Sequence, residues 1–215
     1  MQNQLCEQFR PASWTDVIGQ DKALRIIDAI RRRGLGGRAF WISGKSGIGK
    51  TTIARLLAAD VADDWFTLEL DASDLTPARL RDIESDMGYR ASGRGGRAYI
   101  VNEAHGLRKD TIRQLLVLLE RLPSHVVVIF TTTTDGQAAL FEDCDDSAPL
   151  LSRCVAIPLT SQGLAKPFAE LAKRVAESIG MDGREIAHYV RLVQSCNNNM
   201  RAVYQAVESG AMMTV

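Results

Sequence analysis

The sequence has little that would tie it to a membrane or hold it on a polyanion by bulk charge. Its 26 Lys and Arg residues balance 26 Asp and Glu residues, so the formal net charge is zero and general charge attraction to nucleic acid is not expected. No apolar run approaches the ~20 residues of a spanning helix, and the densest is Val126–Phe130. The first residues contain neither a basic nor an apolar segment, so no signal peptide is predicted.

Cysteine is also sparse. The four cysteines are scattered, with no C-x-x-C pair and no neighbouring histidine (Cys6, Cys144, Cys154, Cys196). This pattern argues against a disulfide scaffold or a zinc module and favours a reducing, cytoplasmic location. The length of 215 residues, with 46% hydrophobic and 24% charged residues, is sufficient to bury an ordinary globular core.

The chain does contain short apolar runs that alternate with helical patterns as far as Pro158. Five runs are typical of strands (Phe40–Ile42, Phe66–Leu70, Ala98–Val101, Val126–Thr131, Val155–Ile157). Four helical patterns lie before or between them (Gln20–Arg33, Thr51–Ala59, Pro77–Met87 after a Thr76 cap, Thr111–Leu119). This alternation predicts an α/β domain over residues 1–159, a parallel sheet with helices on both faces. We expect long loops at Tyr89–Arg97 and Gln137–Ser147.

Helical periodicity replaces the alternation after Pro158. It covers Ala165–Ile179, Arg184–Val193 and Met200–Glu208, with no further strand. Asp182 and Glu185 have the spacing of a capping box for the middle helix. The sequence therefore predicts a small all-helical subdomain over residues 160–215.

One loop carries a specific nucleotide signature. Gly44-Lys45-Ser46-Gly47-Ile48-Gly49-Lys50-Thr51 satisfies G-x-x-x-x-G-K-[ST] between a predicted strand and a helix. The glycines let backbone N–H groups form an anion nest at a helix start. We expect the phosphates of ATP to contact this segment and Thr52, with Lys50 at the β- and γ-phosphates and the Thr51 hydroxyl on Mg²⁺. The alternative, a glycine turn that arose by chance, is disfavoured by the flanking strand and helix.

Two polar residues, Asn102 and Glu103, end the third predicted strand, where an Asp-Glu pair would be usual. Glu103 is placed to polarise the water that attacks the nucleotide; the alternative is a solvated charge at a strand end. Asn102 takes the magnesium-side position with an amide in place of a carboxylate. Because Mg²⁺ favours anionic oxygen, we expect a raised magnesium requirement and slow turnover. His105, His125 and His188 receive no catalytic role.

These motifs, with four others, resemble those of AAA+ ATPases, and specifically of the motor subunits of sliding-clamp loaders. Replication factor C small subunits and bacterial gamma subunits are the nearest types. The other motifs are an adenine-side entry, a strand signature, a Ser-Arg-Cys motif and a lid motif (Phe9–Pro11 with Asp16–Gln20, Leu68–Asp74, Leu151–Cys154, Asn199–Arg201). The resemblance runs from Leu5 to Glu208, and the ordered set is far more specific than the glycine loop alone.

The resemblance implies a P-loop AAA+ sheet followed by a helical lid, and it assigns further site residues. Val17 and Ile18 would line the adenine, or else be ordinary core. Thr134, at the end of the fourth strand, would be the first sensor of the γ-phosphate, with Thr133 as the second choice. Arg201 would be the second sensor, or else a surface arginine of its helix. Arg153 would reach the nucleotide of a neighbouring subunit.

The resemblance also implies a function: binding of Mg-ATP, assembly with copies of itself or related AAA+ subunits, and loading of a sliding clamp on primer-template DNA during replication. Basic residues that could follow DNA cluster around the third strand (Arg79, Arg81, Arg90, Arg94, Arg97, Arg108, Lys109), although a solvated loop is an equal alternative. Arg31–Arg33 fit a helix C-terminus better than a DNA site.

Besides Asn102, two features depart from the family pattern. Asn198 replaces the glycine usual before Asn-Met-Arg, and residues 160–215 are expected to correspond to the lid alone, without the family's helical collar domain. The alternatives are a minimal version of the family, assembly by other means, or a fragment of a longer protein. Two other functions stay open: a helicase loader or branch-migration-type motor, and an ATP-bound scaffold that hydrolyses weakly. No membrane partner is expected.

Overall fold

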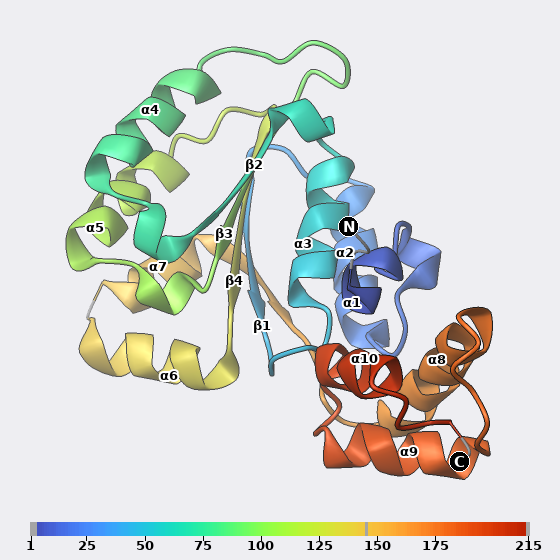
Figure 1. Ribbon diagram of the computed structural model, residues 1–215. Coiled ribbons are helices and arrows are strands. Elements are labelled where there is room, and N and C mark those ends of the chain that lie inside the picture. The colour runs from blue at the N-terminus through green and yellow to red at the C-terminus, as the bar shows by residue number, and fades with distance from the viewer. Residues whose placement is uncertain (1–3, 145, 214–215) are drawn as a thin grey trace. The chain divides into compact units, whose positions relative to one another are not determined.

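The computed structural model of the chain describes residues 4–144 and 146–213. It contains two compact units (Figure 1). An α/β unit comprises Lys22–Gly44 and Lys50–Leu159, and a helical unit comprises Met1–Asp21, Lys45–Gly49 and Thr160–Val215. One boundary between the two units follows Leu159. The described residues up to Asp21 and the tip of the glycine loop group with the C-terminal helices and not with the sheet.

A five-stranded parallel sheet forms the centre of the α/β unit, in the order β2-β3-β4-β1-β5. Its strands match all five apolar runs to within two residues at each end (β1 Arg38–Ser43, β2 Thr67–Asp71, β3 Arg97–Asn102, β4 Val126–Thr132, β5 Cys154–Pro158). The predicted α/β fold class is therefore confirmed. Because all five strands run in one direction, their carboxyl ends share one edge of the sheet.

Helices cover both faces of this sheet. The α/β unit contains α2 (Asp21–Arg31), α3 (Lys50–Ala59), α4 (Pro77–Met87), α5 (Lys109–Leu119), α6 (Thr134–Asp143) and α7 (Ser147–Ser152). In Figure 1, α4, α5 and α7 lie on one face and α3 on the other. Alternate residues of a strand point to opposite faces of the sheet. Trp41 and Phe130 point to the same face, with their ring centroids 5.6 Å apart, and belong to one core cluster with residues of α4 and α5. The Thr76 cap is confirmed, since its hydroxyl accepts the Arg79 N–H at 3.2 Å.

The prediction of a loop over Gln137–Ser147 is wrong. Apart from Asp145, which lies outside the described residues, most of this segment belongs to α6 and to the start of α7. The Thr133 hydroxyl caps α6 by accepting the Gly136 N–H at 3.0 Å, and Gln137 Oε1 accepts the Trp41 Nε1–H at 3.0 Å. Leu140 is buried in the core. The acidic composition of this segment suggested a loop, whereas α6 is stabilised by one helix cap and a few core contacts.

The helical unit is built from α1 (Leu5–Gln8), α8 (Ala165–Ser178), α9 (Ile186–Ser195) and α10 (Met200–Glu208). Glu208 Oε1 accepts the Leu5 N–H at 2.9 Å, which ties the N-terminal segment to α10. Within the described residues, every helix is too short or too polar to span a bilayer.

The capping box expected at α9 is wrong. The helix begins at Ile186, and Glu185 caps it without a side-chain hydrogen bond. Asp182 instead accepts hydrogen bonds from Lys173 Nζ and from the Tyr189 hydroxyl, both at 2.7 Å. The Lys173 hydrogen bond, followed by that of Tyr189, lowers the pKa of the Asp182 carboxyl from its ordinary value of 3.8. Asp182 thus links α8 to α9 through charge.

Asp182→Asn is expected to lower the free energy of unfolding at pH 7. The folded-state pKa of Asp182 lies below its unfolded value, so its stabilising contribution is present above pH 3.8 and is lost as the pH falls through the folded-state pKa. Urea unfolding of wild type and variant at pH 7 and pH 3 measures this difference, which should shrink at pH 3. A difference of equal size at both pH values would show that charge is not the cause.

Candidate functional site

The glycine loop follows the carboxyl end of β1 and leads into α3. Gly47 and Gly49 have φ values of 73° and 104°, in the region where a side chain is strained. Lys50 is only 8% exposed, and its Nζ donates a hydrogen bond to the Gly44 carbonyl at 3.0 Å. Left-handed glycines, a buried ammonium and a helix start together form a cradle suited to phosphate groups.

The tip of this loop packs against α10 within the helical unit. The Met200 N–H donates to the Gly47 carbonyl at 3.1 Å. A Cβ on Gly47 would lie 1.9 Å from Asn199 Oδ1, so only glycine fits there. The same Asn199 oxygen caps α10 by accepting the N–H groups of Arg201 and Ala202 at 3.1 and 3.3 Å. Arg201, which is exposed, therefore lies in the first turn of the helix that touches the loop.

The departure at Asn198 has a conformational explanation. Asn198 has a φ of 61°, a left-handed value that glycine adopts without strain and that asparagine tolerates better than most residues. Its Nδ2 donates to the Ser161 carbonyl at 2.8 Å. Asparagine therefore keeps the backbone turn that precedes α10 and adds a side-chain contact.

The remaining loop and entry residues differ in burial. Ile48 and Thr52 are buried, Thr51 is half-buried and Ser46 is exposed. In the helical unit, Val17 and Ile18 follow the short turn Trp14–Asp16, and both are half-buried. Half-burial leaves apolar surface available, as a base-binding position requires.

Asn102, at the end of β3, has both ends of its amide engaged. Its Nδ2 donates to Glu69 Oε1 of β2 at 2.8 Å, and its Oδ1 accepts the Thr131 hydroxyl of β4 at 2.9 Å. The other Glu69 oxygen accepts from Arg55 Nε at 2.8 Å. A carboxylate is thus present beside Asn102, but it comes from the adjacent strand. Sequence reasoning missed Glu69, whose only signal was its place in the strand signature.

Glu103 has a strained backbone. Its φ and ψ of 51° and 48° are left-handed, which costs a residue with a Cβ about 1–2 kcal/mol. Its side chain is 54% exposed, and Glu103 Oε2 lies 3.5 Å from His105 Nδ1. His105 Nδ1 in turn lies 3.2 Å from the Thr132 hydroxyl, and the Thr132 carbonyl accepts the Gly44 N–H at 3.3 Å. These contacts connect Glu103 to the base of the glycine loop. They include His105, for which no catalytic role was expected.

The expected position of Thr134 at the end of the fourth strand is wrong. β4 ends at Thr132, Thr133 caps α6, and Thr134 is the exposed first residue of that helix. β4 does not extend to Thr134 because the Thr133 hydroxyl accepts the Gly136 N–H and a helix begins there. Among the four threonines, the structure places the hydroxyl of Thr132 nearest to His105.

Arg153 follows α7 and is held by its own α/β unit. Its Nε and Nη2 both donate to Glu120 Oε1, the former at 3.1 Å, and its Nη1 donates to the Pro149 carbonyl at 3.0 Å. Its side chain is 31% exposed. The adjacent Cys154 thiol donates to the Leu150 carbonyl, and burial raises its pKa to about 12, so it stays protonated. The Ser-Arg-Cys segment is thus fixed, with its guanidinium near the surface.

The basic residues around β3 fall on two different edges of the sheet. Arg79 is in the first turn of α4 and Arg108 caps α5, so both lie at the carboxyl edge, beside the strand ends. α4 runs back along the sheet for about 16 Å, and Arg90 and Arg94 follow it in the loop that leads to the amino end of β3. The sequence grouped these residues, but the fold separates them.

No three His, Cys, Asp or Glu side chains form a metal-binding group anywhere in residues 4–144 and 146–213. A magnesium ion at the glycine loop would accordingly take most of its ligands from phosphate oxygens and water, which is the usual arrangement for Mg²⁺ in nucleotide sites. The half-buried Thr51 hydroxyl fits as a single protein ligand. The amide oxygen of Asn102 accepts the Thr131 hydroxyl with one of its two lone pairs, and the other would be available to a metal-bound water.

Asn102→Asp is expected to lower the free energy of unfolding at pH 7 by about 1–3 kcal/mol, because it removes a hydrogen bond and sets two carboxylates side by side. The double variant Asn102→Asp, Glu69→Gln restores an amide–carboxylate pair in reversed order and should recover most of the stability. Equal losses in the single and double variants would contradict this coupling.

Two proteins of known function are similar to this chain in sequence. The tau subunit of DNA polymerase III from Escherichia coli (strain K12) is 26% identical over 237 residues, covering 96% of this chain and 35% of that protein. The replication factor C large subunit of Methanococcoides burtonii is 33% identical over 115 residues, covering 50% of this chain and 23% of that protein. The chain thus spans about a third of the length of the tau subunits. The resemblance to clamp-loader motor subunits is confirmed.

Among solved structures, a variant of Thermotoga maritima RuvB matches with a TM-score of 0.72 at 20% identity, covering 93% of this chain and 64% of that chain. At that identity the likeness concerns the fold alone. The family model for the ATPase family associated with various cellular activities (AAA) matches residues 40–156. Since this match spans more than half of the chain, the protein belongs to the ATPase family associated with various cellular activities (AAA).

Proposed function

We propose that the chain is a clamp-loader-like motor subunit that binds Mg-ATP at the glycine loop and assembles with copies of itself or related AAA+ subunits. The assembly would load a sliding clamp on primer-template DNA during replication. The observation that carries the proposal is the contact of Gly47 with Asn199, which joins the tip of the glycine loop to the helix of Arg201 within the helical unit. The similarity to DNA polymerase III and replication factor C subunits supports it.

ATP supplies the phosphoanhydride bond that is cleaved, and magnesium offsets the charge of its phosphates. Lys50 and the N–H groups of residues 44–51 would hold the phosphates, while Val17 and Ile18 would contact the adenine. Arg201 would meet the γ-phosphate from the first turn of α10. Because Asn199 both caps α10 and packs on Gly47, a small shift of the loop tip changes the position of Arg201.

Glu103 would orient the attacking water, since its side chain is exposed at the strand end and reached by His105. Thr134 is the residue expected to sense the γ-phosphate, but it is exposed at the start of α6. This position favours, as the sensor, a polar group that lies nearer to Thr132, whose hydroxyl contacts His105. Asn102 would act on the magnesium side through water, with the carboxylate of Glu69 behind it. Turnover should therefore be slow, yet not absent.

Arg153 would serve the nucleotide of a neighbouring subunit. In the single chain it is paired with Glu120 and the Pro149 carbonyl. An exposed ion pair of this kind is weak. The Arg153 guanidinium can therefore leave Glu120 and pair with a phosphate when a neighbouring subunit binds. The resting contact keeps the side chain extended along the surface before assembly.

Arg153→Ala should leave ATP affinity nearly unchanged while lowering the hydrolysis rate by about 10³–10⁵, the range measured for arginine fingers in phosphoryl transfer. Mixing this variant with Lys50→Ala should restore part of the activity, because some intact loops then face intact fingers. Steady-state ATPase rates against protein concentration provide the measurement. Arg121→Ala, an exposed neighbour of Glu120, is the matched control. Wild-type turnover by Arg153→Ala alone would refute the trans role.

The DNA partner is tested at the carboxyl edge. If Arg79 and Arg108 contact phosphates, replacing both by Ala should reduce by about two the slope of log affinity against log salt, equally for all sequences. Fluorescence anisotropy with primer-template DNA and ATP, over a salt series, measures this slope. The control removes two charges elsewhere, at Arg33 and Arg191. An unchanged slope in the Arg79, Arg108 variant would remove these residues from the DNA-binding surface.

A further inference from the structure

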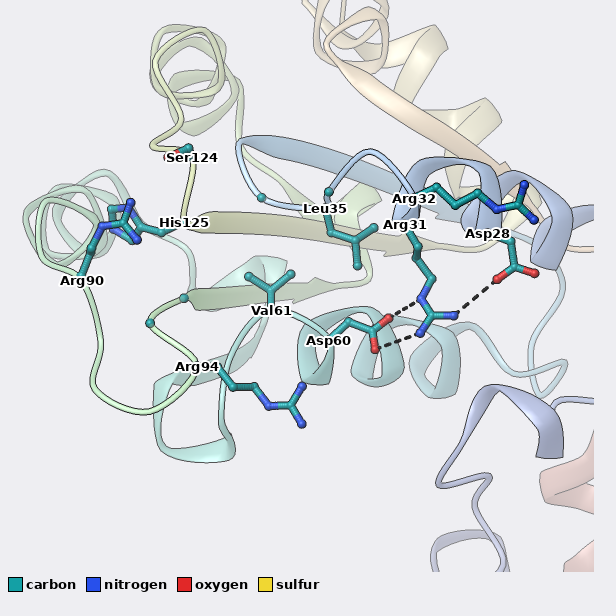
Figure 2. Close-up of a pocket in the computed structure, with 14 residues that line it drawn as sticks. Asp28, Arg31, Arg32, Leu35, Asp60, Val61, Arg90, Arg94, Ser124 and His125 are labelled. Carbon is teal, nitrogen blue, oxygen red and sulfur yellow. Dashed lines mark hydrogen bonds and ion pairs between the residues drawn. The ribbon is translucent and has the colours of Figure 1, made fainter.

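A pocket of about 800 Å³ opens in the α/β unit at the amino edge of the sheet, opposite the edge that carries the glycine loop (Figure 2). Its walls are the segments that lead into three adjacent strands: Gly34–Gly36 before β1, Gly95–Gly96 before β3, and Ser124–His125 before β4. The ends of α2 and α3 complete it. None of these residues takes part in the nucleotide site.

Four arginines and two aspartates line this amino-edge pocket (Arg31, Arg32, Arg90, Arg94, Asp28, Asp60). Arg31 alone engages both acids: its Nε and Nη2 donate to Asp60 at 2.7 and 3.3 Å, and its Nη1 to Asp28 at 3.4 Å. Arg94 pairs with Asp63, beside the pocket, at 3.3 Å. Two of the four arginines, Arg31 and Arg94, are thus paired with aspartates.

The remaining two arginines of the pocket are Arg32 and Arg90. Within the described part of the chain, neither side chain makes a hydrogen bond or an ion pair, and both residues are exposed. In Figure 2, Arg90 and Arg32 lie on opposite sides of the view, and Arg31, Asp60 and Arg94 are drawn between them. The available cations are therefore spread along the pocket, and this spacing suits an extended anion better than a single small one.

The pocket is shaped by backbone that leaves no room for side chains. A Cβ on Gly36 would lie 2.1 Å from the Ser124 carbonyl oxygen, and a Cβ on Gly96 would lie 2.2 Å from that of Val61. The apolar lining residues are Leu35 and Val61, and no lining residue is Phe, Tyr or Trp. A base would find no aromatic ring to stack on, so the pocket offers recognition of phosphate and not of bases.

We propose that the amino-edge pocket is a second anion site, which binds a linear chain of phosphate groups between Arg32 and Arg90. Two sources have this chemistry: the backbone of a nucleic-acid strand and an inorganic polyphosphate. Binding at this edge depends neither on ATP hydrolysis nor on clamp loading. Arg32 belongs to a run that fits a simple helix C-terminus by sequence, and it acquires a ligand because the fold sets it across the pocket from the loop that contains Arg90.

The pocket's own glycines report on binding. In ¹H–¹⁵N spectra of the full chain, the amides of Gly34, Gly36, Gly95 and Gly96 should shift saturably on titration with a short oligothymidylate or with linear polyphosphate. The amides of Gly47 and Gly49 report separately on the nucleotide loop. Shifts with the oligonucleotide alone identify a nucleic-acid strand as the ligand, whereas shifts with both probes identify the phosphate chain itself. Shifts with polyphosphate alone exclude nucleic acid.

Arg32→Gln and Arg90→Gln should each weaken binding at the pocket by about tenfold, the effect of losing one charge-assisted hydrogen bond. Arg33→Gln, the adjacent exposed arginine outside the pocket, should change the affinity less than twofold. ATP hydrolysis should be unaffected by all three. Because the three side chains are exposed, the variants should keep dispersed spectra.

Shifts confined to Gly47 and Gly49, or no shift with either probe, would overturn the second site. Equal weakening by Arg33→Gln would also overturn it, since the attraction would then be general charge. Either result leaves the proposed ATPase function standing, while loss of hydrolysis in Arg153→Ala bears on that function and not on the pocket.

Discussion

The parallel pairing of β1 with β4 is the constraint on which the site depends. Its register sets Ser43 opposite Thr132, so the glycine loop starts beside the end of β4, where Thr132 contacts both Gly44 and His105. The same direction of β2 and β3 brings Glu69 and Asn102 to this edge. A strand of opposite direction at any of these places would carry its polar residues to the amino edge. The chemistry is therefore an outcome of strand direction as much as of residue type.

The sequence predicted the strands, the fold class and the glycine loop well because these depend on local signals. Apolar runs marked β1 to β5, and the loop's residue spacing is diagnostic in itself. It failed where a long-range contact decides the structure. α6 depends on the Thr133 cap and on Trp41 bonding Gln137, a residue far along the chain. Asp182 looked like a helix cap, but pairs with Lys173 on another helix. Register at Thr131–Thr134 was likewise not decidable from four identical residues.

The local charge of this protein's surface depends on which side chains pair in the folded structure, and not on the overall composition. Glu69 faces the amide of Asn102 and the guanidinium of Arg55, so the position where the family pattern would place a second carboxylate beside it carries an amide. At the other edge, Arg31 engages two aspartates and leaves the neighbouring Arg32 uncommitted. A chain with zero net charge thus has local surfaces of definite sign. Such surfaces follow from which side chains meet, and this is decided only by the fold.

The left-handed backbone of Glu103 separates stability from activity at one position. Glycine would occupy this conformation without strain and would recover roughly 1–2 kcal/mol of folding free energy, but it would remove the carboxylate. With the proposed role of Glu103 in orienting water, Glu103→Gly would therefore raise the free energy of unfolding and lower turnover, so that stability and activity change in opposite directions at this one position.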